Sequence, residues 1–146
     1  MISDTSIVKE IQAVISSKDY KKAVDLIEKN KKDLIELDYW YYLSLCSRYQ
    51  ENYKQALAIL NNVIKIDPNY ARAFQEFGHN YFKLNNLKMA LKSYLRAVRY
   101  NPTLHASWLG ILGIKNVDQT TIDLATKNVL YLKNLPPELK SVSSFI

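Results

Sequence analysis

A chain of 146 residues with a formal net charge of +6 suits one compact domain or a short array of stacked repeats. Its apolar share of 48% is ordinary for a globular protein, and its three glycines and four prolines favour long helices over many short strands and turns. The longest apolar run is much shorter than a membrane-spanning helix needs, so the sequence predicts no membrane span.

Cysteine usage and the first residues bear on the cellular setting. Cys46 is the only cysteine, so the chain cannot form an internal disulfide. The opening Met1–Thr5 lacks the basic and then apolar layout of a secretory signal. Together these features predict a reducing, cytoplasmic environment.

The first predicted element is a helical pair over residues 3–36. Apolar side chains recur at helical spacing, and Ser17–Tyr20 interrupts them with turn-forming residues. The apolar positions before this turn are Ile7, Ile11 and Ile15, and those after it are Ala23 and Ile27.

Two series of residues then recur with a period of 34. The first consists of the aromatic residues Trp40, Phe74 and Trp108, and the second of the prolines Pro68, Pro102 and Pro136. Proline lacks a backbone N–H and disfavours a helical conformation in the residue before it, so each proline is expected to begin a turn. The sequence therefore predicts repeats over residues 37–70, 71–104 and 105–136, each with two antiparallel helices.

Small residues at matching positions predict how the two helices of a repeat approach each other. Ser44 and Gly78 lie 34 residues apart in the first helices, and Ala56 and Ala90 lie 34 apart in the second helices. We expect each alanine to meet the small residue of its partner helix.

The last repeat departs from this pattern. Leu124 stands where the two preceding repeats have alanine, although Asp118 is a good N-cap for the second helix. The expected buried stripe of that helix is Ile122, Ala125, Val129 and Leu132.

A terminal helix is predicted over residues 137–146, because proline suits the first turn of a helix. Its apolar face would consist of Leu139, Val142, Phe145 and Ile146. Such a face could continue the array into another repeat, or it could pair with a second copy of the chain as a homo-oligomer.

The motif within each repeat resembles the tetratricopeptide repeat (TPR) family. In residues 71–104 an aromatic residue is followed by a small residue, an alanine in the second helix and a closing proline, namely Phe74, Gly78, Ala90 and Pro102. The resemblance implies an all-α fold in a single domain over residues 1–146. This would be a TPR-type helical-hairpin solenoid of about three repeats plus a terminal helix.

In TPR proteins the first helix of each repeat lines a concave groove that holds a protein or peptide. By resemblance, the groove residues here are Tyr41, Arg48, Tyr49, Arg72, Gln75, His79, Phe82 and Lys83. Their mixture of aromatic, cationic and amide groups suits a peptide with acidic or aromatic side chains. The function predicted is a protein-interaction scaffold or adaptor. The alternative is that these residues serve only for packing or as solvated surface.

A stripe of cations is the second candidate surface. Residues 71–104 contain six basic residues and one acidic residue, and four of the cations share one face of the predicted second helix: Lys88, Lys92, Arg96 and Arg99. This stripe could bind nucleic acid, anionic lipid or an acidic protein, or it could be solvated surface. Nucleic acid is disfavoured, because its binding sites usually combine denser basic charge with stacking aromatics.

No catalytic, metal or cofactor site is predicted. His79 and His105 have no partner at metal-ligand spacing, and Cys46 lies in an apolar helix. The chain is therefore predicted not to be an enzyme. In a weaker resemblance, residues 36–146, which include Leu135–Leu139, are similar to the N-terminal half of bacterial proteins that join TPR repeats to a sulfotransferase domain. That resemblance implies another alternative, the regulatory region of a larger sulfotransferase-like enzyme.

Overall fold

The computed structural model describes residues 2–140, and their regular elements are helices α1 to α9 and one short 3-10 helix. The chain divides into two compact units, Met1–Pro68 and Asn69–Ile146. The predicted all-α class, built from helical hairpins, is confirmed. Within the described range no helix is both long and apolar enough to cross a membrane.

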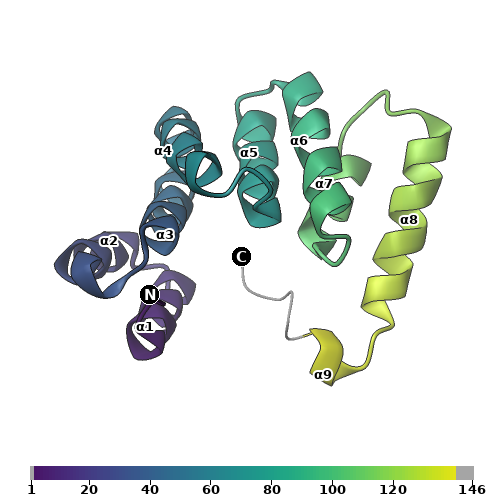
Figure 1. The fold of residues 1–146 in the computed structure, drawn as a ribbon. Helices are drawn as coiled ribbons and strands as arrows, with labels where there is room; N and C mark the ends of the chain where they lie inside the picture. Colours follow the sequence, from purple (N-terminus) through teal and green to yellow (C-terminus); the bar gives the residue numbers. More distant parts are fainter. Residues whose placement is uncertain (1, 141–146) are drawn as a thin grey trace. The chain divides into compact units, whose positions relative to one another are not determined.

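The first unit contains two helical hairpins (Figure 1). The first hairpin is α1 (Thr5–Ser16) and α2 (Tyr20–Lys29), which a 3-10 helix (Lys31–Asp33) follows, and the second is α3 (Glu36–Tyr49) and α4 (Tyr53–Ile66). Each of these helices packs against the next one along the chain.

Small side chains lie at the centre of both hairpins. In the first hairpin, Ala23 of α2 and Ile11 of α1 are fully buried. In the second, Ser44 of α3 and Ala56 of α4 are fully buried, and the Ser44 hydroxyl donates to the Tyr41 carbonyl over 2.6 Å. This hydrogen bond satisfies the polar group that a small residue brings into the core.

The N-terminal segment is tied to the start of α3. The Ser3 hydroxyl donates to the Asp38 carboxylate over 2.6 Å and accepts from the backbone N–H of Ile35 over 2.8 Å. The backbone N–H of Asp4 donates to the Asp33 carbonyl over 2.8 Å. The Ser3 hydroxyl thereby satisfies one backbone N–H at the start of α3, a helix whose cap residue Ile35 makes no side-chain hydrogen bond.

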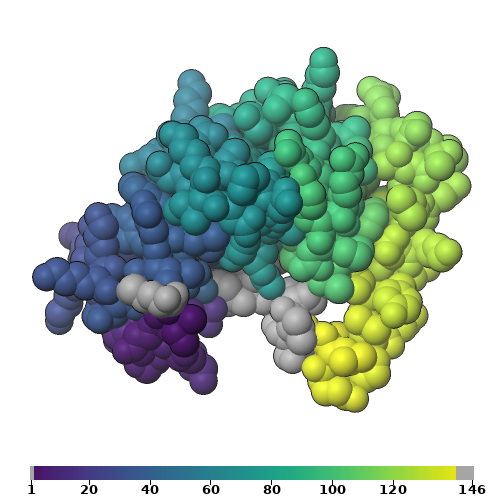
Figure 2. All heavy atoms as spheres, viewed as in Figure 1, coloured from purple at the N-terminus to yellow at the C-terminus, as the bar shows by residue number. Residues whose placement is uncertain are grey.

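The second unit runs from α5 to α9. Its helices are α5 (Ala71–Lys83), α6 (Leu87–Tyr100), α7 (His105–Leu112), α8 (Gln119–Lys133) and the short α9 (Pro137–Lys140). Successive helices from α5 to α8 pack on one another, and α7 also packs on α5. In the space-filling view the side chains of α5 and α6 fill the gap between their ribbons (Figure 2).

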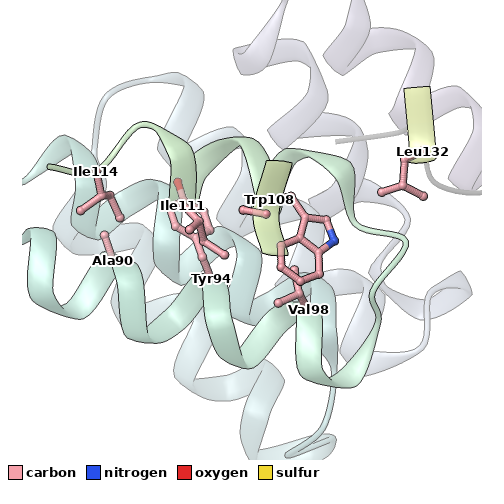
Figure 3. Packing of buried hydrophobic residues seen from close by; sticks show 8 residues of the cluster. Ala90, Tyr94, Val98, Trp108, Ile111, Ile114 and Leu132 are labelled. Atoms are coloured by element: carbon pink, nitrogen blue, oxygen red, sulfur yellow. The ribbon is translucent and has the colours of Figure 1, made fainter. Parts of the chain in front are cut away.

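The core of the second unit joins α6 to α7 in antiparallel register. Figure 3 shows Trp108 beside Val98, Ile111 beside Tyr94 and Ile114 beside Ala90. Residue numbers therefore increase along α7 and the turn after it in the direction in which they decrease along α6. The indole N–H of Trp108 donates to the Pro102 carbonyl over 2.8 Å, which satisfies the one polar group of this buried ring.

Tyr94 lies against two glycines. A Cβ atom added at Gly78 of α5 would lie 2.5 Å from Tyr94 Cδ1, and one added at Gly110 of α7 would lie 2.5 Å from Tyr94 Cζ. A small residue is needed at Gly78, as predicted, but the side chain that packs against it is not the expected one. The atoms nearest to that missing Cβ belong to Tyr94, one helical turn beyond the expected Ala90.

The turn inside each helical pair contains one residue in the left-handed region. These residues are Lys18, Glu51, Asn85 and Asn116, with φ of 67°, 65°, 60° and 64°. After α3 the backbone N–H groups of Glu51 and Asn52 donate to the carbonyls of Arg48 and Ser47, and the matching pair of bonds follows α5. This is the Schellman arrangement, which satisfies the last carbonyls of the first helix.

The last helical pair, α7 and α8, packs differently from the pattern that the period of 34 predicts. Asp118 caps α8 as expected and accepts from the Thr121 backbone N–H over 3.2 Å. Ala125 is fully buried, whereas Leu124 is 49% exposed, so the small packing residue lies one position later than the period of 34 predicts. The rest of the predicted terminal helix, with Val142, Phe145, Ile146 and the suggested self-pairing, lies outside the described residues.

Candidate binding surfaces

The predicted groove residues of the first unit differ in exposure. Tyr41 has only 2% of its surface exposed, and its ring meets the edge of Tyr42 with centroids 5.4 Å apart. It therefore offers a partner almost none of its side chain. Arg48 and Tyr49, at the end of α3, are half-buried.

A stack of three side chains surrounds this end of α3. The rings of Tyr20 and Tyr49 are nearly parallel, at 5° with centroids 5.1 Å apart, and the Arg48 guanidinium lies 4.5 Å from the Tyr49 centroid. Sequence reasoning did not include Tyr20, because it lies in the preceding hairpin and its proximity to Tyr49 depends on tertiary packing. The two rings and the cation contact one another and so form a rigid surface. Aromatic and arginine side chains are the ones that contribute most of the binding energy at protein interfaces.

Two of the predicted residues on α5 serve the packing of the second unit. Gln75 is fully buried, and its Oε1 accepts from the Ser107 hydroxyl of α7 over 2.8 Å. His79 is half-buried, with Nδ1 2.7 Å from the Tyr94 hydroxyl and the two rings edge to face. Gln75 thus joins α5 to α7, and His79 joins α5 to α6.

The C-terminal end of α5 is open. Phe82 is 38% exposed and Lys83 is exposed, while Arg72 at the other end of α5 is half-buried. Phe82 and Lys83 lie 34 residues after Arg48 and Tyr49, so α3 and α5 both end on one aromatic and one cationic residue. We call Arg48–Tyr49 and Phe82–Lys83 the end pairs.

The basic stripe lies on the outer face of α6. Lys88, Lys92, Arg96 and Arg99 are all exposed. Within residues 2–140 none of the four forms an ion pair. Glu76, the one acidic residue between residues 71 and 104, is fully buried, so it does not offset the stripe at the surface.

Arg96 is held by aromatic rings. Its guanidinium lies 4.5 Å from the centroid of Phe74 and 5.9 Å from that of Tyr100, and its Nε is 3.4 Å from the Tyr100 hydroxyl. Phe74 and Tyr100 contact each other with centroids 5.7 Å apart. The arginine is therefore more restricted than an ordinary surface cation.

A surface hollow of about 300 Å³ lies along the stripe, and we call it the α6 hollow. Its lining residues are Lys92, Leu95, Arg96, Arg99 and Tyr100. Lys88, one turn before Lys92, is not among them. Leu95 and Tyr100 were not singled out from the sequence, but both follow stripe residues at helical spacing and could have been found by that signal.

The reactive groups of the chain are in unreactive settings. Cys46 is fully buried, and burial raises the pKa of its thiol to about 12, so the thiol is neutral at physiological pH. Burial, together with the Glu28 carboxylate 2.7 Å away, raises the pKa of Tyr39 to about 12. The residues between 2 and 140 contain no group of three histidine, cysteine or acidic side chains placed to hold a metal ion.

Helical hairpins with a period of 34 define a helical-repeat protein. Residues 37–70 and 71–104 each match a family model described as tetratricopeptide repeat. The chain thus contains two segments that match tetratricopeptide repeats, and their bounds coincide with those of two repeats predicted from the prolines and aromatics. Such repeats are protein-interaction modules.

Individual proteins resemble the chain at low identity. Anaphase-promoting complex subunit 3 of Schizosaccharomyces pombe is 28% identical over 72 residues, which are 49% of this chain and 11% of that protein. A double mutant of MamA RS-1 has a TM-score of 0.69 at 22% identity, over 87% of this chain and 73% of the other. The Sgt2 TPR domain from Aspergillus fumigatus has a TM-score of 0.65 at 18% identity, over 92% and 88%. Each of these two structures shares its fold with this chain.

Proposed function

We propose that the protein is a non-catalytic scaffold that captures partner protein segments through its end pairs, with Arg48–Tyr49 as the binding surface of the first unit and Phe82–Lys83 as that of the second. The observation that carries the proposal is that the first helices of the two matched repeats, α3 and α5, both end on one aromatic and one cationic side chain, in opposite order. The yeast relative is named as a subunit of a complex, which agrees with a role in assembly.

The end pairs combine apolar area with positive charge. Phe82 is a large apolar side chain left 38% exposed beside a lysine, and the Tyr49 ring is stacked between Tyr20 and Arg48. Aromatic and arginine side chains dominate the binding energy of protein interfaces, and their rigidity lowers the entropy lost on binding. The favoured partner segment carries aromatic and acidic side chains, which match these two kinds of group.

The test is capture of partners from a lysate of source cells, with captured proteins identified by mass spectrometry. Arg48→Ala/Tyr49→Ala and Phe82→Ala/Lys83→Ala should each reduce recovery of the main partner by about tenfold or more. The matched control is Lys127→Ala/Tyr131→Ala, which removes an exposed cation and a tyrosine that is 65% exposed from α8. Unchanged recovery with both end-pair variants, or equal loss with the control, would contradict the proposal.

The remaining groove residues take supporting roles in this proposal. Tyr41 and Gln75 are buried, so they set the positions of neighbouring side chains. His79 lies one helical turn before Phe82–Lys83, whereas Arg72 lies at the opposite end of α5. The resemblance to sulfotransferase-linked repeats stays a prediction, and the scaffold function does not depend on it.

A further inference from the structure

We propose that the α6 hollow is a docking site for an acidic segment of a partner protein, in which an aliphatic side chain enters the hollow and carboxylates flank it. The site lies on the second helix of a repeat and uses none of the end-pair residues. It would therefore act independently of the function proposed above.

The hollow carries positive charge that no neighbouring acidic residue of the described chain neutralises. Lys92, Arg96 and Arg99 line the hollow and form no ion pair within the described part of the chain. Like charges four residues apart on a helix repel, and α6 contains no acidic residue that would relieve this repulsion. A carboxylate-bearing partner would supply the missing counter-charge.

Preorganisation is the second argument. Arg96 lies over the Phe74 ring, and its Nε is directed to the Tyr100 hydroxyl at 3.4 Å. Its two Nη groups have no hydrogen-bond partner among residues 2–140, so they can bind a carboxylate in a forked arrangement. Because the side chain is already restricted, it loses less entropy when it binds.

The shape of the hollow favours a side chain over a larger ligand. About 300 Å³ is at the small end of the range for ligand pockets, and the floor includes Leu95, which is 36% exposed. An aliphatic side chain would cover Leu95 and the ring of Tyr100. The cations at the rim would then face the acidic residues on either side.

The aromatic rings near the stripe argue against nucleic acid. Single-stranded nucleic acids bind by stacking bases on exposed rings. Phe74 is only 7% exposed and Arg96 covers its ring, while Tyr100 is half-buried beside the same guanidinium. Phe74 therefore offers no open face for a base, and the half-buried Tyr100 is one ring rather than the series of exposed rings on which successive bases stack.

The test measures fluorescence anisotropy of labelled peptides with the full chain at low salt. The peptides are runs of Asp and Glu in which a single Leu is moved from end to end. The comparison ligands are single-stranded DNA of equal charge and phosphatidylserine vesicles. At least one peptide should bind more tightly than an all-acidic peptide and more tightly than the DNA or the vesicles, and added salt should weaken it.

Variants then locate the site. Lys92→Gln/Arg99→Gln should weaken the preferred peptide by about tenfold or more, because it removes two of the three cations at the hollow. Lys88→Gln, which removes one exposed cation of the same helix outside the hollow, should change it by less than about twofold.

Three results would overturn the proposal. The first is that no peptide in the set binds, and the second is that DNA or vesicles bind more tightly than the peptides. The third is that Lys88→Gln weakens peptide binding as much as Lys92→Gln/Arg99→Gln does. The last result would mean that a diffuse field, rather than the hollow, attracts the ligand.

Discussion

At the residue scale, Tyr94 organises the second unit. Its ring lies between the backbones of Gly78 and Gly110, and its hydroxyl is 2.7 Å from His79 Nδ1. A single side chain of α6 therefore packs on both α5 and α7. Gly78 and Gly110 are needed because even a methyl group at either position would occupy the space of this ring.

Replacing either glycine should destabilise the protein. Gly78→Ala and Gly110→Ala each place a Cβ 2.5 Å from a ring atom of Tyr94, which is too close for the ring and the helices to keep their positions. We expect each to lower the free energy of unfolding by about 1–3 kcal/mol, the usual cost of overpacking. Urea denaturation followed by circular dichroism measures it.

Gly113 provides the matched control for these variants. A Cβ at this position would lie 3.4 Å from the nearest atom, and its φ of −81° suits any residue. Gly113→Ala should change stability by less than about 0.5 kcal/mol or raise it slightly. A loss equal to that of Gly78→Ala would show that contact with the Tyr94 ring is not the cause of the destabilisation.

Cys46 should report the opening of the first unit. Because burial raises the pKa of its thiol to about 12, the thiolate is about a thousandfold rarer at neutral pH than for a thiol of pKa about 9. We expect labelling with Ellman's reagent at pH 8 to be negligible in the native protein and rapid in denaturant. Fast labelling of the native chain would contradict the burial of Cys46.

Residue roles were only partly predictable from the sequence. The period of 34 identified Gly78 as a close-approach position but not Tyr94 as the side chain that it admits. Tyr41 and Gln75 occupy positions that line the groove in related repeats, yet both are buried here. Helical spacing gives the face on which a side chain lies, but burial depends on the neighbouring side chains, which local sequence does not specify.

At the element scale, the turn between paired helices recurs along the chain, but the type of residue at its left-handed position varies. Asn85 and Asn116 tolerate the left-handed conformation well, whereas Lys18 and Glu51 adopt it at a cost. The sequence predicted the first of these turns, Ser17–Tyr20, from its turn-forming residues. It could not show which residue takes a positive φ, because several polar residues stand side by side in each turn.

Glycine at position 51 should therefore stabilise the first unit. Glu51→Gly removes the steric cost of φ 65° and should raise the free energy of unfolding by about 1 kcal/mol. Glu51→Ala removes the same charge but keeps a Cβ, so it should leave stability within about 0.5 kcal/mol. Thermal unfolding of the two variants distinguishes them, and equal stability would rule out backbone strain as the cause.

Helix boundaries were the most predictable elements, because caps and prolines act locally. Asp118 begins α8 as expected, and α4, α6 and α8 all end before the predicted prolines. The displaced packing alanine, Ala125, was not predictable from the period. The segment between α7 and α8 is longer than the other turns within pairs, and this shifts the register of the last helix.

At the scale of the whole molecule, positive charge is concentrated rather than spread. Residues 71–104 carry six basic residues and one acidic residue, whereas residues 1–36 carry seven of each. Local fields, more than total charge, determine how a protein meets a charged surface.

Chromatography should detect this concentration. On a cation exchanger at neutral pH, Lys92→Gln/Arg99→Gln should elute at lower salt than Lys22→Gln/Lys29→Gln, although both variants lose two charges. The first pair belongs to the uncompensated stripe, whereas acidic residues of the same helix surround the second. Identical elution would indicate that the stripe does not act as a local patch.

The position of Tyr94 has a consequence for choosing expression boundaries. A fragment that ends at residue 104, where the second matched repeat ends, would remove Gly110 from one side of the Tyr94 ring and Ser107 from Gln75. An aromatic ring and a buried amide would then face water. The sequence repeat is therefore shorter than the segment that can be expressed as a stably folded fragment. A stable fragment must extend through α7.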